Sequence, residues 1–323
     1  MDNSATGMSI VVPFLNEENT IPIFCETMDD FASSLDFPLE FVFVNDGSED
    51  NSVDLLLNYK FNHVNKIKII DFSKNFGAHA ALRAGFLNAS YDYCTWFGMD
   101  LQEPLSIITT AYDKLVKEHY EVVYFEKRTV VVSKLNRLFS KIYSNMMRRY
   151  AVKNYSSNGT ATIAFGAKIK GVLNQNIESN SSILLQIMDA GFRHISVPLD
   201  YNERSAGKSK WTLQKKIKLF IDSFVAFSFM PIRLVSIIGV VLFLLGVFCG
   251  IFIIINRLLN PDVPIGYSTI ASVLAVGFGI TNISLGIIAE YLWRTYDSAR
   301  RRPVFIISDI YTSDSDGNEQ DGI

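Results

Sequence analysis

Apolar runs of strand length alternate with helical patterns along the first half of the chain. The runs that predict strands are residues 9–13, 41–44, 67–70, 93–97 and 122–125. Residues 20–33 and 78–87 have the three- and four-residue apolar spacing of helices. This alternation is typical of an α/β fold with a mostly parallel sheet. Because ligands of such sheets bind beyond the carboxyl ends of the strands, the polar residues after each run are the first candidates for a site.

Two long uncharged stretches, residues 234–255 and 267–289, occupy the last third of the chain. As an α-helix the first would be about 33 Å long, enough for the ~30 Å hydrocarbon core of a bilayer. Lys and Arg cluster before the first stretch and after the second, whereas the connecting loop holds only Arg257. The positive-inside rule therefore predicts a transmembrane hairpin with both chain termini in the cytosol. The alternative is a buried hairpin of a soluble protein.

These patterns divide the chain into four predicted segments. They are a catalytic domain over 1–211, a basic amphipathic helix over 212–232, the membrane hairpin over 233–293 and a cytosolic tail over 294–323. The amphipathic helix is expected to lie in the membrane interface, with an ordinary surface helix as the alternative. No signal peptide precedes the first strand, so the catalytic domain is expected in the cytosol. The acidic, small-residue composition from Ser308 onward predicts disorder.

Composition excludes several classes of protein. With 49% hydrophobic and 20% charged residues, the chain of 323 can bury a core. Its net charge of −3 argues against a protein that binds nucleic acid. Three widely spaced cysteines, Cys25, Cys94 and Cys249, form no metal-binding pattern and are expected to be reduced structural thiols.

Two polar segments follow the second and third predicted strands. Asp46, within Asn-Asp-Gly-Ser, can accept hydrogen bonds from a base or ribose held over the sheet edge, although the tripeptide is also a common turn. Lys74 and Asn75 lie in the loop that opens the next helix. These residues are candidates for binding a nucleotide.

The fourth predicted strand leads into Asp100 and Gln102, which fall on the same side of the chain. A carboxylate and a side-chain amide oxygen are hard ligands suited to Mg²⁺ or Mn²⁺. Such an ion would bind the diphosphate of a nucleotide and act as a Lewis acid on it. Asp100 and Gln102 are therefore the best metal candidates.

Basic residues in two later segments are candidates for binding phosphate. The first set follows the fifth strand and shares one helical face: Arg128, Arg137, Ser140 and Lys141. Solvated surface side chains are the alternative for these. The second set, Arg204, Ser209 and Lys210, lies in a basic loop beside the predicted membrane surface, where a phosphate on a lipid would lie.

Seven segments in order resemble GT-A family 2 glycosyltransferases that use polyprenyl phosphate, such as bactoprenol glucosyltransferases and dolichol-phosphate mannose synthases. The likeness covers almost the whole chain. The matching segments are 11–18, 45–48, 75–77, 100–104 (close to Asp-Leu-Gln-Asp-Pro), 204–210, 284–292 and 301–303.

The resemblance implies a GT-A fold and, together with the residue patterns above, predicts the following roles. The nucleotide-binding residues would be Pro13, Asn16, Glu17, Asp46, Lys74 and Asn75. Asp100 and Gln102 would hold Mg²⁺ or Mn²⁺. The lipid-phosphate-binding residues would be Arg128, Arg137, Ser140, Lys141, Arg204, Ser209 and Lys210, and Asp100, Arg128 and Arg204 would be catalytic.

The resemblance also implies the reaction. It is an inverting transfer from a nucleotide-sugar, with UDP expected by analogy, to undecaprenyl or another polyprenyl phosphate. The enzyme would be a multi-pass protein of the cytoplasmic (inner) membrane, would serve cell-surface glycan or O-antigen modification, and would form homotetramers as relatives do.

Position 98 departs from the pattern of the family, because Gly98 replaces the first aspartate of its DxD motif. The change implies one of three consequences: metal binding is weaker, another group such as Asp46 takes the place of the aspartate, or activity is reduced. Two other functions remain open: a transferase that extends a polysaccharide, whose Gln-x-x-Arg-Trp motif is missing here, and a membrane scaffold that has lost catalysis.

Overall fold

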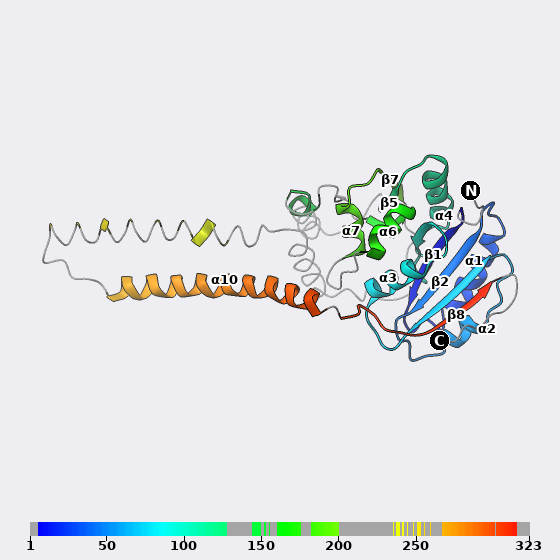
Figure 1. The fold of residues 1–323 in the computed structure, drawn as a ribbon, viewed down its shortest axis with the longest axis horizontal. Helices are drawn as coiled ribbons and strands as arrows, with labels where there is room; N and C mark the ends of the chain where they lie inside the picture. The colour runs from blue at the N-terminus through cyan, green and yellow to red at the C-terminus, as the bar shows by residue number, and fades with distance from the viewer. Residues whose placement is uncertain are drawn as a thin grey trace. The chain divides into compact units, whose positions relative to one another are not determined.

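The computed structural model describes most of the chain in two compact units (Figure 1). The described residues are 6–127, 144–149, 152, 155, 160–175, 182–199, 267–300 and 302–314, with isolated positions between 235 and 259. The first unit combines Met1–Ile217 with Pro303–Ile323, and the second is Lys218–Arg302. The second unit is therefore an insertion, in sequence, between two parts of the first.

An eight-stranded sheet in the order β7-β5-β6-β4-β1-β2-β3-β8 forms the centre of the first unit. Its strands are β1 (Met8–Phe14), β2 (Leu39–Asn45), β3 (Lys66–Phe72), β4 (Tyr93–Trp96), β5 (Val122–Lys127), β6 (Thr160–Phe165), β7 (His194–Leu199) and β8 (Ile307–Asp314). Strands β4, β1, β2 and β3 are parallel neighbours, and β5 is parallel to β7. The pairs β4–β6, β5–β6 and β3–β8 are antiparallel. The predicted α/β fold with a mostly parallel sheet is confirmed.

Helices connect the parallel strands, as parallel pairing requires. In the described part of the first unit the helices include α1 (Ile21–Ala32), α2 (Ser52–Asn58), α3 (Ala78–Asn88), α4 (Ser106–Tyr112), α6 (Ala167–Gln175) and α7 (Ile183–Asp189), with a π-helical turn over Asp113–Lys117. The predicted helices at 20–33 and 78–87 correspond to α1 and α3. Both begin just after the carboxyl end of a strand.

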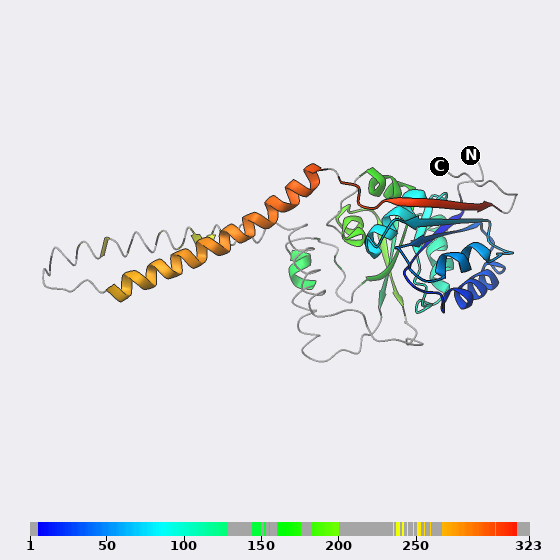
Figure 2. The same ribbon diagram turned by 90° about the horizontal axis from the view of Figure 1, so that it is seen from below.

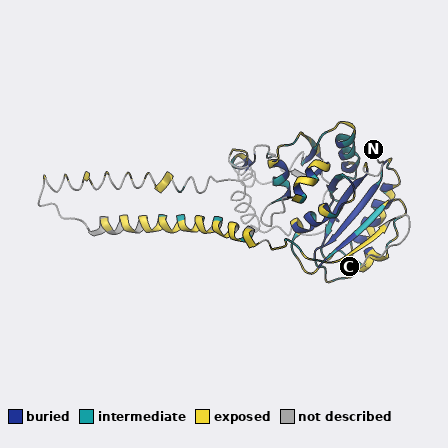
Figure 3. Cartoon of the chain, viewed as in Figure 1, coloured by how far each residue is buried: buried dark blue, intermediate teal, exposed yellow. Residues whose placement is uncertain are grey.

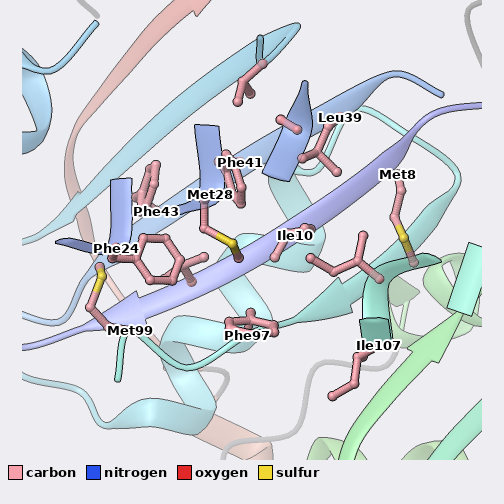
Figure 4. Close-up of a cluster of buried hydrophobic side chains, with 14 of the residues drawn as sticks. Met8, Ile10, Phe24, Met28, Leu39, Phe41, Phe43, Phe97, Met99 and Ile107 are labelled. Atoms are coloured by element: carbon pink, nitrogen blue, oxygen red, sulfur yellow. The ribbon is translucent and has the colours of Figure 1, made fainter. Parts of the chain in front are cut away.

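The core between α1 and the sheet is built on aromatic side chains (Figure 4). Phe24 of α1 meets Phe41 and Phe43 of β2 edge-on, with ring centroids 6.3 and 6.1 Å apart, and Phe97 at 6.4 Å. All four side chains are fully buried. Edge-to-face pairs of this kind stabilise by about 0.5–1.5 kcal/mol each beyond their burial. They fix α1, and hence the loop before it, on the sheet.

Helix α3 approaches the sheet closely because Gly85 has no side chain. A Cβ atom at this position would lie 2.2 Å from Cγ1 of Val11 in β1. Gly85 therefore serves helix–sheet packing.

The prediction of disorder from Ser308 onward is wrong for the residues as far as Asp314. They form β8, which pairs antiparallel with β3 at the edge of the sheet (Figure 2). Most of its residues are exposed (Figure 3), so main-chain hydrogen bonds to β3 stabilise it more than burial does. An exposed edge strand tolerates the charged and small residues that suggested disorder.

In the second unit, the structure describes one long helix, α10 (Tyr267–Arg300), which contains the second predicted span. Across the described part of the chain, no helix combines the length and the hydrophobicity needed to cross a membrane. The first predicted span lies mostly outside the described residues, and the amphipathic helix over 212–232 lies wholly outside them. The transmembrane hairpin thus stays a prediction.

Candidate active site

Four loops meet at one edge of the sheet. They follow β1, β2, β3 and β4, which are adjacent and parallel, so their carboxyl ends point the same way. The predicted nucleotide and metal residues of the first 102 positions lie in or beside these loops. The common edge that the sequence predicts for them is therefore present.

The loops after β1 and β2 are joined by reciprocal hydrogen bonds. The Asn16 N–H donates to Ser48 Oγ at 2.9 Å, and the Glu49 N–H donates to Asn16 Oδ1 at 2.9 Å. Next to them, the Glu17 N–H donates to Ser52 Oγ at 2.9 Å. Asn16 adopts a left-handed backbone with φ 53°, which asparagine tolerates better than most residues. Asn16 and Glu17 thus help to build the site, beside any contact with a ligand.

Asp46 holds the loop after β3. Its Oδ1 accepts the Phe76 N–H at 2.7 Å and the Gly77 N–H at 3.0 Å, and its Oδ2 lies 3.0 Å from the Gly77 nitrogen. Burial raises the pKa of the Asp46 carboxyl, while the two N–H donors act to lower it. Both carboxylate oxygens are engaged within the protein, so Asp46 positions the segment that carries Lys74 and Asn75.

Gly47 lets the loops after β2 and β3 touch. It has φ 76°, and a Cβ atom there would lie 2.6 Å from the carbonyl carbon of Lys74 and 2.7 Å from the Asn75 nitrogen. Any other residue would be strained by its backbone angle and would displace main-chain atoms. The Asp-Gly-Ser turn is therefore both a turn and a support for the neighbouring loop.

A pocket of about 460 Å³ opens between these two loops. Lys74 and Asn75 line it, together with Ser48, Glu49 and Asp71. Lys74 brings a positive charge that also lies over the Phe76 ring, 5.2 Å from its centroid. Hydroxyl, amide and carboxylate groups of this kind suit the hydroxyl and N–H groups of a nucleoside.

Of the predicted nucleotide residues, only Lys74 and Asn75 line this pocket; Pro13, Asn16, Glu17 and Asp46 do not. Sequence reasoning missed Asp71, which accepts a hydrogen bond from Asn45 Nδ2 at 2.6 Å. The signal was an acidic residue at the end of β3, directly after the apolar run that predicted the strand.

Asp100 and Gln102 lie together at the end of β4. Gln102 Nε2 donates to Asp100 Oδ2 at 2.6 Å. The positive φ of Leu101, 51°, turns the chain here and brings Glu103, which the sequence did not single out, back towards Gly98. A Cβ atom at Gly98 would lie 2.9 Å from Asp100 Oδ1 and 3.2 Å from Glu103 Oε2.

The side chains at this turn offer oxygen donors of the type that a divalent metal prefers. Among the described residues, no group of three or more His, Cys, Asp and Glu side chains is arranged around a metal position. Two carboxylates and one amide oxygen, from Asp100, Glu103 and Gln102, are nevertheless the hard oxygen donors that Mg²⁺ and Mn²⁺ prefer, with water and diphosphate completing the sphere.

All the predicted lipid-phosphate residues lie outside the described part of the chain. They are Arg128, Arg137, Ser140, Lys141, Arg204, Ser209 and Lys210. Cys25 and Cys94, in contrast, are described, and both are buried free thiols. Burial raises the pKa of each to about 12, so these two cysteines are inert structural residues.

Comparison with known proteins assigns this arrangement to a family. The profile of "Glycosyl transferase family 2" matches residues 9–169, which run from β1 into α6. An uncharacterized glycosyltransferase of Bacillus subtilis (strain 168), YkcC, is 31% identical over 94% of each chain. The chain belongs to glycosyl transferase family 2. It is therefore a glycosyltransferase, as the motifs of the sequence predict.

This family 2 glycosyltransferase has further relatives with more specific names. The undecaprenyl-phosphate 4-deoxy-4-formamido-L-arabinose transferase of Yersinia enterocolitica (serotype O:8 / biotype 1B) is 28% identical over 97% of this chain and 96% of that one. Among solved structures, the mannosyltransferase PcManGT from Pyrobaculum calidifontis, in complex with GDP-Man and Mn²⁺, is 16% identical. It has a TM-score of 0.42 and covers 62% of this chain and 57% of that one.

Proposed function

We propose that this glycosyltransferase moves a sugar from a nucleotide-sugar, expected to be UDP-linked, onto undecaprenyl or another polyprenyl phosphate. The reaction takes place at the cytosolic face of the inner membrane and supplies a cell-surface glycan. The observation that carries the proposal is the shared sheet edge. The pocket between the loops after β2 and β3 lies at the carboxyl ends of the parallel strands, as do Asp100 and Gln102.

The acceptor is supported by two independent facts. The Yersinia relative, aligned over nearly the whole chain, is named for a transfer that involves undecaprenyl phosphate. In addition, α10 exposes large apolar side chains: Ile270, Val273, Leu274, Phe278, Ile283, Leu285, Ile288, Leu292 and Trp293. Exposed apolar surface of this extent indicates contact with a membrane or another protein. An enzyme bound to a membrane through α10 would meet its lipid-linked acceptor in that membrane.

The chemistry is a single in-line displacement with inversion. A phosphate oxygen of the lipid forms a bond to the anomeric carbon, and the bond from that carbon to the nucleotide diphosphate breaks. The lipid phosphate is already ionised near pH 7, so the protein needs no strong general base. Lys74 and Asn75 would bind the donor, and Asp100 and Gln102 would hold Mg²⁺ or Mn²⁺, which neutralises charge on the leaving diphosphate.

The test uses the full chain, purified in detergent, with Mn²⁺, undecaprenyl phosphate and a panel of nucleotide-sugars. We expect a lipid-linked sugar, detected by mass spectrometry, with one donor strongly preferred. Asp100→Asn should reduce the rate by at least about 100-fold, because charge stabilisation at the leaving group contributes several kcal/mol. The matched control is Asp30→Asn, since Asp30 is exposed on α1, and it should leave the rate unchanged.

The outcomes separate the alternatives. Sugar added to a growing glycan but never to the lipid phosphate would assign the chain to the polysaccharide-extending transferases. If the chain forms no product and binds no nucleotide, it is not a catalyst, and a scaffold is favoured.

A further inference from the structure

The space beside Gly98 is already filled by carboxylates. A Cβ atom at this position would lie 2.9 Å from Asp100 Oδ1, which is closer than such contacts normally come, and 3.2 Å from Glu103 Oε2. A side chain at residue 98 would therefore point to the place where the ends of the Asp100 and Glu103 side chains now lie. The missing aspartate of the family motif has not left a void.

The local backbone explains how Glu103 reaches this place. The Leu101 N–H donates to the Gly98 carbonyl at 3.3 Å, and the left-handed Leu101 reverses the chain. Pro104 follows, and its carbonyl accepts the Ile107 N–H at 3.0 Å at the start of α4. Glu103 is thus held between a tight turn and a helix, and it is only 6% exposed.

Side-chain length also favours Glu103. The motif that this segment resembles has aspartate at the fourth position of Asp-Leu-Gln-Asp-Pro, whereas this chain has glutamate. Glutamate has one methylene more than aspartate, so its carboxylate extends further from the main chain; here Oε2 lies 3.2 Å from the position of a Cβ atom at residue 98.

The other candidate substitute, Asp46, is engaged elsewhere. Both of its oxygens accept main-chain N–H groups of the loop after β3, from Phe76 and Gly77. Turning Asp46 towards a metal would leave these partly buried donors without their acceptor, which is unfavourable. Glu103 needs no such rearrangement, since it already lies beside Asp100.

We propose that Glu103 supplies the second carboxylate of the divalent-metal site, in the place of the absent side chain at position 98. The proposal rests on the proposed function, because that function supplies the reason for a metal. It makes Asp100 and Glu103 the two acidic ligands beside the amide oxygen of Gln102, whose Nε2 also orients Asp100 through its hydrogen bond.

The test measures metal binding directly. Mn²⁺ is titrated into the full chain in detergent with UDP present, and the free ion is followed by its EPR signal. Glu103→Gln keeps the shape of the side chain and should weaken Mn²⁺ binding about 10- to 100-fold. The double variant Gly98→Asp with Glu103→Gln returns a carboxylate to the same space and should restore most of the affinity.

Glu26→Gln is the matched control, since Glu26 is exposed on α1, and it should bind Mn²⁺ as the parent chain does. Thermal unfolding of each variant without metal shows whether the turn is intact. Unchanged Mn²⁺ affinity in Glu103→Gln would overturn the proposal. A loss of Mn²⁺ affinity in Glu103→Gln that the double variant fails to restore would also overturn it, because Glu103 would then act only by holding the turn. A parent chain that binds no Mn²⁺ would overturn it as well.

Glycolipid formation by the parent chain, measured on the same preparation, separates this inference from the proposed function. If the parent chain forms product and Glu103→Gln binds Mn²⁺ unchanged, only the role of Glu103 is refuted and the proposed function stands. The expected Mn²⁺ pattern without any glycolipid would refute the proposed acceptor and leave the role of Glu103 in place.

Discussion

Asp46 shows how a residue with a recognisable motif can serve the site through its neighbours. Its buried carboxylate accepts the N–H groups of Phe76 and Gly77 and so fixes the loop that bears Lys74 and Asn75. Hydrogen bonds to a charged group are worth about 1.5–3 kcal/mol each. The loop is therefore pre-organised before any ligand arrives.

Replacing Asp46 by Asn should loosen this loop. The amide has one oxygen to accept with, and its NH₂ group would face a main-chain donor. We expect the free energy of unfolding to fall by about 1–3 kcal/mol and UDP to bind roughly tenfold more weakly. Urea unfolding and calorimetric titration with UDP check the two effects, and Asp30→Asn is the control. Unchanged UDP affinity would show that the loop does not depend on Asp46.

The sequence predicts the sheet edge at which these residues lie but not their contacts. Asp46, Lys74, Asp100 and Gln102 each follow a predicted strand, and the parallel strands bring them to one edge. The role of Glu103 could not be read in the same way, since it depends on the left-handed turn at Leu101, which no strand or helix pattern predicts.

At the scale of elements, the segment that leads into β8 contacts the start of the loop after β3. Phe305, just before β8, stacks on Phe72 with ring centroids 5.4 Å apart and planes 9° apart. Phe72 in turn meets Phe76 edge-on at 5.6 Å, and the Ser73 N–H donates to the Ile306 carbonyl at 3.1 Å. The C-terminal strand therefore contacts the segment that leads into the pocket.

Phe305→Ala should disturb the pocket without unfolding the protein. Loss of one stacked pair costs about 0.5–1.5 kcal/mol plus the lost burial. We expect faster amide hydrogen exchange over residues 72–77 and several-fold weaker UDP binding. Ile306→Ala is the control, because its side chain is 49% exposed and its main-chain bond to Ser73 would remain. Equal behaviour of the two variants would contradict this role of the stack.

The elements themselves were predictable to different degrees. Strands β1 and β2 are buried along almost their whole length, so they read as continuous apolar runs. Strand β8 lies at an edge and is stabilised mainly through its main chain, so its acidic sequence carries no such signal. The composition rule for disorder fails where a partner edge is available.

For the whole molecule, the second unit is inserted between two parts of the first, so an internal deletion can test whether the first unit folds and binds UDP without it. Residues 218–302 can be replaced by about 20 Gly and Ser residues, whose root-mean-square span is roughly 25 Å. We expect this variant to remain folded and to bind UDP, but not to sediment with vesicles as we expect the full chain to do. A chain that simply ends at residue 217 lacks β8 and should be less stable and prone to aggregate. Far-UV circular dichroism, UDP titration and sedimentation with vesicles compare the two.

An internal deletion that fails to bind UDP, although folded, would contradict the independence of the first unit. Loss of membrane association in the truncated chain alone, and not in the internal deletion, would place the membrane contact outside residues 218–302.

The position of β8 in the sequence also determines when the sheet can be completed during synthesis of the protein. The sheet begins at residue 8, yet its last strand leaves the ribosome only after the whole of residues 218–302 has been made. Until then β3 is an open edge, able to pair with any strand that meets it. The nascent chain is thus most vulnerable to misassembly while residues 218–302 are being made, because the sheet cannot be completed until β8 follows them.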